Sequence, residues 1–376
     1  MTFLDLGINE TLVKKLQKSG IKQPTPIQKE SIPLILSQHD LIGEAQTGTG
    51  KTLAFLLPIF QNLDAKLDYT QALILAPTRE LALQITDAAK MLAKDTDISV
   101  LSVYGGTNIG SQLKKLKKRI HLIIATPGRL IDHIERETVD LSNVNTVVID
   151  EADQMLLLGF KNEVTRILSQ TPHHRQTLCF SATMSSGVKR LASSMTFEPK
   201  YVTIEASSPT VSKIRQELVE TTDRWKADAL CQVLLEDNPF LAIIFCRTKR
   251  RADDLYNKMK KNQFNVQVIH SDIAQNKRER ILKSFRSADL QYLIATDVAS
   301  RGLDISGVSH IYNFDVPETP EIYIHRIGRT GRAGDDGYTC MFYAPKDFEE
   351  LNMIERRLRF NIKRREVEFI RHKMTK

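Results

Sequence analysis

The sequence predicts an α/β protein of two domains, each built on a mostly parallel sheet flanked by helices. Ten short apolar runs recur along the chain with helical stretches between them. Their hydrophobic positions are nearly continuous rather than alternating, which is typical of strands buried on both faces of a parallel sheet. Because strands and helices alternate, the arrangement is expected to be doubly wound. A length of 376 residues also favours two domains over one.

The expected strands form two groups separated by a polar stretch that contains a proline. The polar stretch, Glu205–Ser212, breaks both helical and strand periodicity, so it is expected to be a linker. The domains are then 1–204 and 213–376, with the linker at 205–212. The first group of strands is Ala72–Ala76, Val100–Tyr104, His121–Ala125, Val144–Ile149 and Thr177–Phe180, preceded by a shorter run at Asp40–Gly43. The second group is Leu241–Cys246, Val266–His270, Tyr292–Ala295, His310–Phe314 and Tyr338–Tyr343.

Composition narrows the class of protein and its partners. The net charge of +8 and the pI near 9.2 favour a polyanionic partner, although an ordinary basic enzyme would have the same charge. The first ten residues lack the pattern of a secretory signal, and no apolar stretch approaches the length of a membrane span. The four cysteines have no paired spacing, which argues against a zinc site or a disulfide framework and fits a reducing compartment. We therefore expect a cytoplasmic protein with no membrane partner.

A phosphate-binding loop is expected at Ala45–Thr52, followed by a long apolar run at Leu53–Phe60. Its glycines allow backbone N–H groups to turn inward, and at a helix N-terminus these groups cradle phosphate oxygens. Lys51 would reach the β and γ phosphates, and the Thr52 hydroxyl would hold Mg²⁺. A glycine-rich turn can also be purely structural, and Ala45 replaces the first glycine of the usual pattern. The candidate nucleotide-binding residues are Ala45, Gln46, Thr47, Gly48, Thr49, Gly50, Lys51 and Thr52.

Polar residues follow the predicted strands repeatedly. In open α/β sheets, ligands bind at the carboxyl ends of strands, so these residues are expected to line one edge of each domain. The phosphate loop would share that edge in the first domain. The residues concerned are Thr78-Arg79, Thr126–Arg129, Asp150-Glu151 and Ser181–Thr183 in the first domain, and Arg247 and Thr296-Asp297 in the second.

Two adjacent acids, Asp150 and Glu151, add the chemistry of hydrolysis. Asp150 would hold Mg²⁺ beside the phosphate loop, and Glu151 would orient and deprotonate a water molecule. The alternative is a cluster of acids that caps a helix at Gln154–Phe160, because acids also suit that position. The Lys51 loop upstream favours the catalytic interpretation.

The segment Asp150–Asp153 reads Asp-Glu-Ala-Asp, and here the chain resembles the DEAD-box RNA helicases of superfamily 2. The resemblance extends over residues 1–360. It implies two tandem RecA-like domains, ATP and Mg²⁺ as cofactors, and RNA as partner. Gly20–Gln28 resembles the family's adenine-reading Q motif, which implies that Gln28, Gln23 and the upstream Phe3 contact ATP. The sequence departs from the family pattern at Ile21, where an aromatic residue is frequent, and at Ser271, where glycine is usual.

The same resemblance assigns roles to residues in both domains. It implies that Arg329 and Arg332 are arginine fingers, so that the catalytic set is Lys51, Thr52, Asp150, Glu151, Arg329 and Arg332, and that Asp304 touches the ribose. It implies RNA contacts for Pro77, Thr78, Arg79, Gly105, Gly106, Thr126, Pro127, Gly128, Arg129, Arg247, Thr296 and Arg301. It implies coupling between the domains for Asp153, Ser181, Thr183, Gln275, Arg278, His325 and Arg326. Taken singly, each RNA-site arginine is more commonly a solvated or capping residue, and a histidine such as His325 is often structural.

Two basic runs lie outside these motifs. Lys114–Arg119 is expected to be a solvated helix face. Near the C-terminus, Leu351, Ile354 and Leu358 give the last helix an apolar stripe. We expect that helix to pack on the core and to be followed by a basic extension that either binds RNA non-specifically or is solvated.

The expected function is RNA-dependent ATP hydrolysis that unwinds short RNA duplexes locally or remodels RNA and its protein complexes. ATP and RNA are expected to close the domains and complete one site from both. RNA would be bound as a single strand or short duplex with little dependence on sequence, because phosphate contacts carry no sequence information. Ribosome-related partners are compatible with this reading. An ATP-gated RNA clamp with slow turnover is the alternative, whereas a DNA helicase is disfavoured by the Q motif and the DEAD form of the acidic motif.

Overall fold

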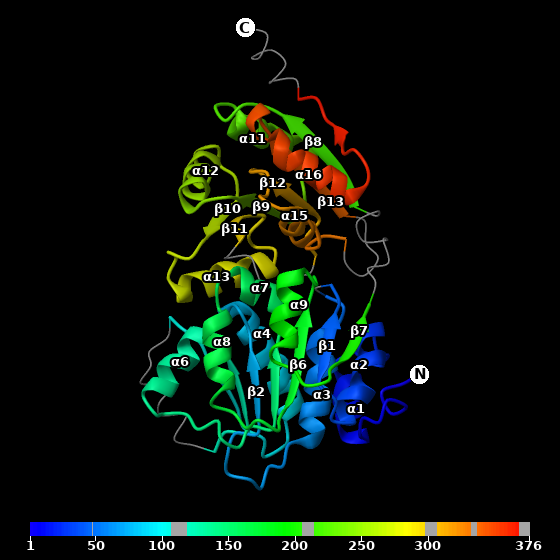
Figure 1. Ribbon diagram of the computed structural model, residues 1–376. Coiled ribbons are helices and arrows are strands. Elements are labelled where there is room, and N and C mark those ends of the chain that lie inside the picture. The colour runs from blue at the N-terminus through cyan, green and yellow to red at the C-terminus, as the bar shows by residue number, and fades with distance from the viewer. Residues whose placement is uncertain (47, 107–118, 205–213, 298–306, 332–336, 368–376) are drawn as a thin grey trace. The chain divides into compact units, whose positions relative to one another are not determined.

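The computed structural model describes residues 1–46, 48–106, 119–204, 214–297, 307–331 and 337–367 (Figure 1). It divides into two compact units, Met1–Ala206 and Ser207–Lys376. The predicted linker at 205–212 lies outside the described residues, so the predicted domain boundaries stay predictions. Each unit is described by itself.

The first unit contains one sheet of seven parallel strands in the order β3-β4-β2-β5-β6-β1-β7. Its strands are β1 (Leu41–Glu44), β2 (Ala72–Leu75), β3 (Val100–Val103), β4 (Leu122–Ala125), β5 (Thr146–Ile149), β6 (Gln176–Ser181) and β7 (Lys200–Thr203). Its helices are α1 (Glu10–Lys18), α2 (Pro26–Leu36), α3 (Lys51–Asn62), α4 (Arg79–Ala93), α6 (Pro127–Glu135), α7 (Ala152–Leu157), α8 (Lys161–Leu168) and α9 (Ser186–Ser193).

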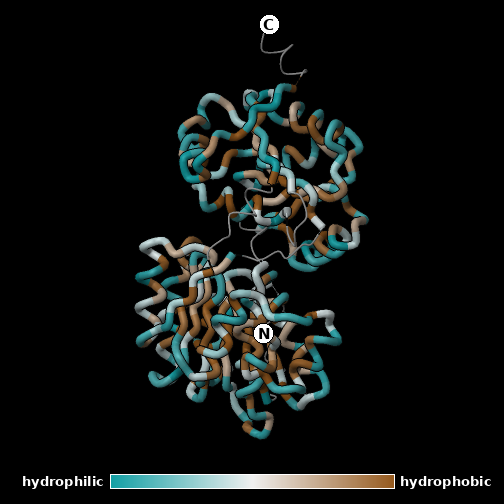
Figure 2. The backbone as a smooth tube through the Cα atoms, turned by 90° about the vertical axis from the view of Figure 1, so that its right-hand side faces the viewer, coloured by the Kyte–Doolittle hydropathy of each residue, from teal (hydrophilic) through white to brown (hydrophobic). Residues whose placement is uncertain are grey.

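Helices cover both faces of this sheet, as continuous apolar strands require. Along β2, Ile74 belongs to the hydrophobic cluster that includes α3 and α4, whereas its neighbours Leu73 and Leu75 belong to the cluster that includes α6 and α8. Successive side chains of a strand point to opposite faces, so a strand between two helical layers must be apolar at every position. In Figure 2 the hydrophobic colour is accordingly concentrated in the strands inside each unit.

The second unit contains a second sheet of seven parallel strands, in the order β10-β11-β9-β12-β13-β8-β14. Its strands are β8 (Ile214–Glu220), β9 (Ala242–Cys246), β10 (Val266–Ile269), β11 (Tyr292–Thr296), β12 (His310–Asn313), β13 (Gly337–Tyr343) and β14 (Lys363–Arg364). Its helices are α11 (Lys226–Asp237), α12 (Lys249–Lys261), α13 (Gln275–Arg286), α15 (Pro320–Ile327), the short 3₁₀ helix η2 (Pro345–Asp347) and α16 (Phe348–Leu358).

Counting strands within each unit from its own first strand makes the two strand orders identical, 3-4-2-5-6-1-7. Two helical layers again cover the sheet, since Ile244 of β9 faces the cluster with α12 and Ile243 faces the cluster with α13. The predicted fold class of two parallel α/β sheets is therefore confirmed. The core packing of the last helix is confirmed as well, because Leu351 and Ile354 of α16 are buried.

Three strands were not predicted, and all three carry weak apolar signals. Three of the four β7 residues are exposed, β14 has only two residues, and β8 contains the charged residues Arg215 and Glu217. These are strands at or near a sheet edge, where burial does not force an apolar run. Part of the predicted basic extension is thereby ordered: β14 pairs with β8, and Arg365 forms ion pairs with Glu236 and Asp237 at 2.7 Å. Residues 368–376 lie outside the described residues.

Helix α7 begins and ends earlier than the predicted helix at Gln154–Phe160. Glu151 adopts the left-handed conformation at its N-terminus, and Gly159, with φ of +79°, follows its C-terminal end. Over the residues described, no helix is both long and apolar enough to cross a membrane. All four cysteines are unpaired and buried.

Candidate nucleotide and nucleic-acid sites

The phosphate loop connects β1 to α3 at the carboxyl edge of the first sheet. Gly50 is the N-cap of α3 with φ of +93°, a conformation that favours glycine. A Cβ at this position would also lie 2.9 Å from the Thr25 hydroxyl oxygen. Since Gly50 has no side chain to cap the helix, the first amides of α3 keep their N–H groups for an anion.

Lys51 is the first residue of α3 and is 6 % exposed. Its Nζ donates a hydrogen bond to the carbonyl oxygen of Ala45 at 2.6 Å, which holds the ammonium group over the loop. The loop is braced further by the Thr49 hydroxyl, which donates to the carbonyl oxygen of Gln46 at 2.7 Å. Thr52 is half-buried on the next position of the helix, and Gly48 is exposed. Thr47 lies outside the described residues.

The two candidate catalytic acids follow β5, two strands away from β1 in the sheet. Asp150 is 2 % exposed and Glu151 is 6 % exposed. Burial raises the pKa of Asp150 to about 7, the positive charge of Lys51 opposes this shift, and the carboxylate of Glu151 adds to it. The charge of Lys51 therefore acts directly on Asp150, as a paired phosphate-loop lysine and metal-binding carboxylate require.

Glu151 carries backbone strain. Its φ of +50° and ψ of +54° are left-handed, a conformation that costs an L-residue roughly 1–2 kcal/mol. Its backbone N–H donates to Oδ1 of Asp150 at 2.9 Å. The residue occupies the N-cap position that the structural alternative predicted, yet its side chain makes no capping hydrogen bond. The turn instead directs two consecutive carboxylates away from the end of one buried strand.

Three predicted coupling residues lie together next to these acids. The backbone N–H of Asp153 donates to the Ser181 hydroxyl at 3.3 Å, and the Thr183 hydroxyl donates to Oδ2 of Asp153 at 3.1 Å. The Ser181 hydroxyl donates to the carbonyl oxygen of Thr183 at 2.7 Å. The acidic motif after β5 and the Ser-Ala-Thr motif after β6 are thus one connected group. Their coupling to the second unit stays a prediction.

The Q motif contacts the phosphate loop directly. Gln28, in the first turn of α2, is 2 % exposed, and its Nε2 donates to the carbonyl oxygen of Gly50 at 2.9 Å. Its Oε1 accepts from the backbone N–H of Thr25 at 3.0 Å. Gln23 is exposed, whereas Phe3 is 1 % exposed and packed in the core. Gln28 therefore links the adenine motif to the loop, and the roles of Gln23 and Phe3 toward ATP stay predictions.

The candidate RNA motifs of the first unit follow β2, β3 and β4, which are neighbours in the sheet. Thr78 caps α4 by accepting from the backbone N–H of Leu81 at 3.2 Å. The Arg79 guanidinium lies against Gly105 and Gly106, so closely that a Cβ on Gly106 would overlap it. Gly106 has φ of +83°, a second reason for glycine there.

The third of these motifs begins α6. Thr126 is its N-cap, Pro127 is buried, Gly128 is exposed, and Arg129 pairs with Asp132 at 3.4 Å. The strand order therefore brings all three motifs to one stretch of the sheet edge, as the sequence predicted.

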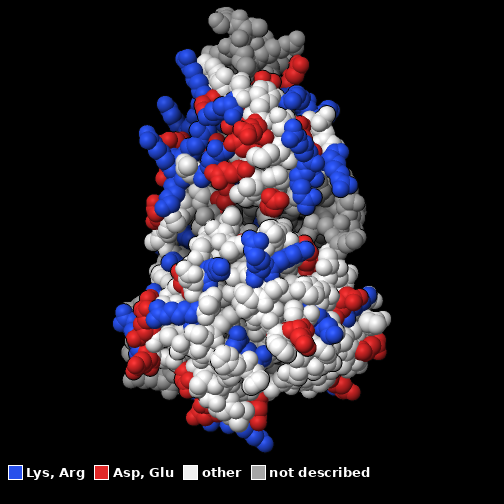
Figure 3. All heavy atoms as spheres, viewed as in Figure 1, with Lys and Arg blue, Asp and Glu red and all other residues white. Residues whose placement is uncertain are grey.

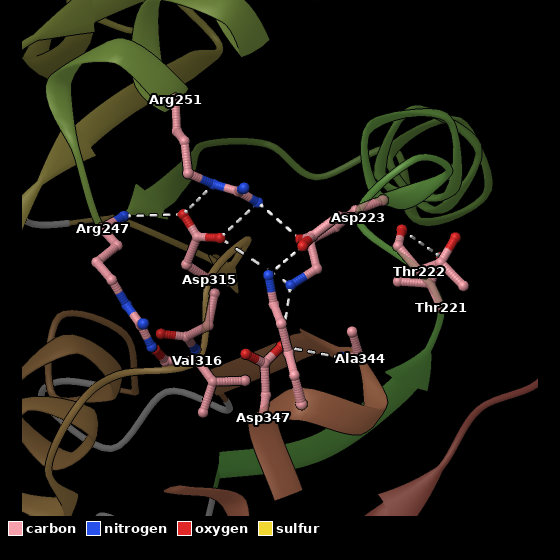
Figure 4. Close-up of polar contacts among 12 residues, drawn as sticks. Thr221, Thr222, Asp223, Arg247, Arg251, Asp315, Val316, Ala344 and Asp347 are labelled. Carbon is pink, nitrogen blue, oxygen red and sulfur yellow. Dashed lines mark hydrogen bonds and ion pairs between the residues drawn. The ribbon is translucent and has the colours of Figure 1, made fainter.

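In the second unit, Arg247 is held by the segment that follows β12 (Figure 4). Its backbone N–H donates to Oδ2 of Asp315 at 2.9 Å, and its Nη2 donates to the carbonyl oxygen of Val316 at 2.9 Å. Arg251 pairs with the same Asp315 carboxylate at 2.7 Å. The Arg247 side chain is 36 % exposed, so it is positioned at its base and accessible along its length.

Buried charge surrounds Asp315. Lys226, 1 % exposed, lies 4.0 Å from Oδ1 of Asp315 and 3.4 Å from Oδ2 of Asp347. Burial lowers the pKa of Lys226, and the two carboxylates oppose this shift. The sequence did not single out Lys226, Asp347, Arg251 or Asp315. The rule that polar residues follow strands could have found Asp315, two residues beyond β12.

Arg326 is committed to the interior of the second unit. Its guanidinium makes two bonds with Asp297, at 2.6 and 2.7 Å, and lies 5.0 Å from the centroid of the Phe245 ring. It also donates to the carbonyl oxygen of Asp315 at 2.9 Å. This network fixes the end of α15, where Arg329 is 7 % exposed and its backbone N–H bonds to Arg326.

The remaining candidates of the second unit are less informative. Gln275, Arg278 and Thr296 are buried and His325 is half-buried. Arg301, Asp304 and Arg332 lie outside the described residues, as does most of the basic run Lys114–Arg119.

Comparisons with known proteins point to one family. Residues 25–191 match the sequence profile described as DEAD/DEAH box helicase, and residues 225–334 match that of the helicase conserved C-terminal domain. The chain is 47 % identical over 355 residues to the DEAD-box ATP-dependent RNA helicase CshA of Bacillus subtilis, covering 94 % of this chain and 72 % of that protein. It is 46 % identical to the CshA of Geobacillus kaustophilus, covering 94 % of this chain and 76 % of the relative.

Solved structures agree with the sequence relatives. S. cerevisiae Dbp5 bound to RNA and ADP BeF3 is similar with a TM-score of 0.89 and 30 % identity, covering 97 % of this chain and 95 % of that chain. Mss116p bound to ssRNA and AMP-PNP is similar with a TM-score of 0.86 and 32 % identity, covering 97 % of this chain and 79 % of that chain.

Proposed function

This chain belongs to the DEAD-box family of ATP-dependent RNA helicases, and from that premise we propose that it unwinds short RNA duplexes locally or remodels RNA with its bound proteins. The residue assignments that follow are part of the proposal. Each is supported by the contacts of the described residues.

The first unit binds the triphosphate of ATP at the carboxyl edge of its sheet. The open amides at the start of α3 accept phosphate oxygens, and Lys51 exchanges the Ala45 carbonyl for the β and γ phosphates. Gln28, bonded to Gly50, carries contact with the base to the same loop. The two ends of the nucleotide are thus sensed by one connected piece of backbone.

Asp150 and the Thr52 hydroxyl are suited to hold Mg²⁺, since this ion prefers oxygen ligands and keeps several waters. Among the described residues, no group of three or more His, Cys, Asp or Glu could hold a metal by itself, which fits an ion bound largely through nucleotide phosphates. When bound, Mg²⁺ would neutralise phosphate charge. Asp150 must lose its proton to act as a ligand, and its raised pKa makes that step depend on nearby positive charge.

Glu151 takes a proton from the attacking water. It is buried beside Asp150, and its strained backbone holds the carboxylate on the loop side of β5. General-base assistance of this kind is worth about 10²–10⁴ in rate. Arg329 and Arg332 contribute positive charge to the transition state, which arginine fingers do with gains of about 10³–10⁵.

RNA phosphates bind along the motifs that follow β2, β3 and β4 in the first unit, and beside Arg247 in the second. Arg79 is held flat against Gly105 and Gly106, and Arg247 is fixed by Asp315 and Val316. Fixed guanidinium groups favour phosphate contacts over base contacts, so binding should depend little on sequence.

The observation that carries the proposal is the shared edge of the first sheet. Lys51 influences Asp150 electrostatically, Asp150 bonds to Glu151, and the acidic motif bonds to Ser181 and Thr183. The RNA motifs end on the same side of the same sheet. A change at the nucleotide therefore has a short path to the RNA contacts.

A strand-release assay tests the function. A short RNA duplex is mixed with protein and ATP, a nonhydrolysable ATP analogue or no nucleotide, and release of the labelled strand is measured alongside ATP hydrolysis. Local unwinding predicts release with ATP and faster hydrolysis with RNA. Stable capture of RNA without strand release would favour the ATP-gated clamp and contradict the proposal.

We also propose a cytoplasmic location, because all four cysteines are buried as free thiols, as expected in a reducing compartment. Proteins bound to the RNA substrate, ribosomal proteins among them, are the partners that remodelling would require. Crosslinking of the protein to RNA in cells would identify them.

A further inference from the structure

The positive charge of this chain is concentrated on two helices of the second unit. Helix α12 carries six Lys and Arg against two Asp, and α13 carries five Lys and Arg against one Glu. Their combined excess of eight equals the formal net charge of the whole chain, +8, so the other residues are balanced. A solvated surface needs no such concentration, whereas a polyanion partner does.

The two helices border the same edge of the sheet. Strand β10 is the outermost strand, α12 packs on one of its faces through Leu255 and Met259, and α13 packs on the other through Ile281 and Phe285. In Figure 3, blue side chains gather on the left of the second unit, where Figure 1 places α12. The charge therefore wraps around one edge of the unit.

Most of this charge has no acidic partner. Seven of the eleven basic residues are exposed and form no ion pair within the part of the chain that the structure describes. By contrast, Lys249, Arg251 and Lys258 pair with Asp272, Asp315 and Asp228. We define the basic edge as the seven unpaired residues: Arg250, Lys260 and Lys261 of α12, and Lys277, Arg280, Lys283 and Arg286 of α13.

The acids near the basic edge are mostly engaged elsewhere. Asp253 bonds to Nε2 of His270 at 3.0 Å, and Glu279 accepts from Gln275 at 3.1 Å. Asp289 accepts from the Ser287 hydroxyl at 2.6 Å. A shallow cavity between β10 and α13 is lined by Asn265, Gln267, Lys277, Arg280 and Ser284 among others, which are hydrogen-bond donors suited to phosphate oxygens.

The basic edge continues from the proposed RNA path. Helix α12 begins two residues after Arg247, and β9, β10 and β11 end side by side at the carboxyl edge of the sheet. RNA bound beside Arg247 and extending outward over the last strand would pass onto α12 and α13. We propose that the basic edge binds the phosphate backbone of RNA that flanks the strand held at the proposed site, and so anchors a longer substrate during local unwinding.

This inference rests on the proposed RNA path, and the rival explanations are physical. Lysines around an outer strand also protect it from pairing with other chains. An acidic protein segment could use the same charges. RNA is favoured because the enzyme brings RNA to the neighbouring strand ends, and because four cations spaced by three residues along α13 span roughly 14 Å, enough for several phosphates.

The test compares two variants that lose equal charge. The edge variant combines Lys260→Gln, Lys261→Gln, Lys277→Gln and Arg280→Gln. The control variant combines Lys18→Gln, Lys66→Gln, Lys90→Gln and Lys161→Gln, four exposed lysines of the first unit. Each protein is titrated, with a nonhydrolysable ATP analogue, against the shortest single strand that fully stimulates ATPase. The same strand is then tested with a duplex flank and with a single-stranded flank, each over a series of salt concentrations. Thermal melting verifies that all proteins are folded.

The wild-type protein and the control variant should bind flanked RNA more tightly and with a steeper salt dependence than the short strand. The edge variant should lose this gain, its salt slope falling by about 0.7–0.9 for each phosphate contact removed, while its affinity for the short strand stays normal. Comparison of the two flanks shows whether duplex or single strand is preferred.

Two results would overturn the inference. If the edge variant binds flanked RNA as the control does, the basic edge serves another partner or only protects the strand. If affinity falls equally for short and flanked RNA, the charges act at the primary site. Failure of the wild-type protein to bind the short strand would instead refute the proposed function, so the two failures are distinguishable.

Discussion

The two units have the same strand order, so residues that follow corresponding strands can be compared directly. In the first unit, β1 leads to Lys51 at the start of α3, and β5 leads to Asp150. In the second unit, the corresponding β8 leads to Lys226 at the start of α11, and β12 leads to Asp315. Each unit therefore has a buried lysine and an aspartate at matching places.

The surroundings of the two lysines differ. Lys51 bonds to a carbonyl oxygen of its own loop, and that loop contains two glycines with positive φ. Lys226 lies near two carboxylates, Asp315 and Asp347, and the connection before it, Thr221–Trp225, contains no glycine. In the second unit, Asp347 supplies the negative charge that a phosphate would supply in the first.

The comparison teaches that strand order creates the position and local residues decide its use. An open loop with a lysine invites an anion, whereas a protein carboxylate turns the same position into a structural ion pair. A related contrast concerns Thr78 and Thr248, which cap α4 and α12 in the same way after corresponding strands. That shared feature is local, so both units could keep it.

The largest effect is expected at Lys51. Lys51→Ala removes the cation that reaches the phosphates, so ATP turnover should fall to the level of a reaction without enzyme, while the melting temperature changes little. ATPase and melting curves measured on one preparation test this, with Lys66→Ala as an exposed control. Near-normal turnover would mean that the loop does not hold the triphosphate.

Arg329→Ala should reduce RNA-stimulated turnover by about 10³–10⁵ if the second unit supplies a cation to the reaction. ATP affinity should be largely retained. The control is Arg357→Ala on α16, which is exposed. A lowered melting temperature together with normal turnover per folded molecule would show that Arg329 only stabilises the second unit.

Glu151→Gln should slow hydrolysis by about 10²–10⁴ and leave ATP and RNA binding intact, since the amide cannot accept the proton. A long-lived RNA complex is the expected consequence. Glu137→Gln is a matched control, because Glu137 is also a left-handed glutamate but is exposed. Loss of ATP binding in the Glu151 variant would assign this residue to nucleotide or metal binding instead.

Lys226→Met tests the other half of the comparison. Removing one partner from a buried ion pair leaves unpaired carboxylates and typically costs about 3–5 kcal/mol, so the unfolding free energy should fall while ATP affinity at low temperature stays normal. Chemical denaturation and nucleotide binding measure the two quantities. Lys249→Met, in an exposed pair with Asp272, should change stability far less. Loss of ATP affinity without loss of stability would contradict the structural role of Lys226.

The smallest effect is expected at Gln28. Gln28→Ala removes hydrogen bonds worth about 1–2 kcal/mol, so ATP should bind roughly tenfold more weakly and discrimination against GTP should narrow. Competition binding with both nucleotides measures this, and Lys29→Ala on the same helix is the control. Equal weakening for ATP and GTP would indicate that Gln28 only braces Gly50.

Local patterns in the sequence were sufficient for much of this molecule. Continuous apolar runs predicted the buried parallel strands, and Gly48, Gly50 and Lys51 predicted a loop before a helix. Both are interactions between residues close in sequence, so their signal is present without the fold. Strands β7 and β14 escaped because exposed edge strands need no apolar run.

Only the tertiary structure decided which charges are structural. Lys226 and Asp347 are 121 positions apart and Arg326 and Asp297 are 29 apart, and in the sequence each is an ordinary charged residue. Burial gives these pairs their strength, because a charge removed from water must find a partner. The same accounting left seven cations on α12 and α13 without one. Which lysines and arginines are free to meet RNA therefore follows from the folded chain, whereas the position of the phosphate loop was already evident in its residues.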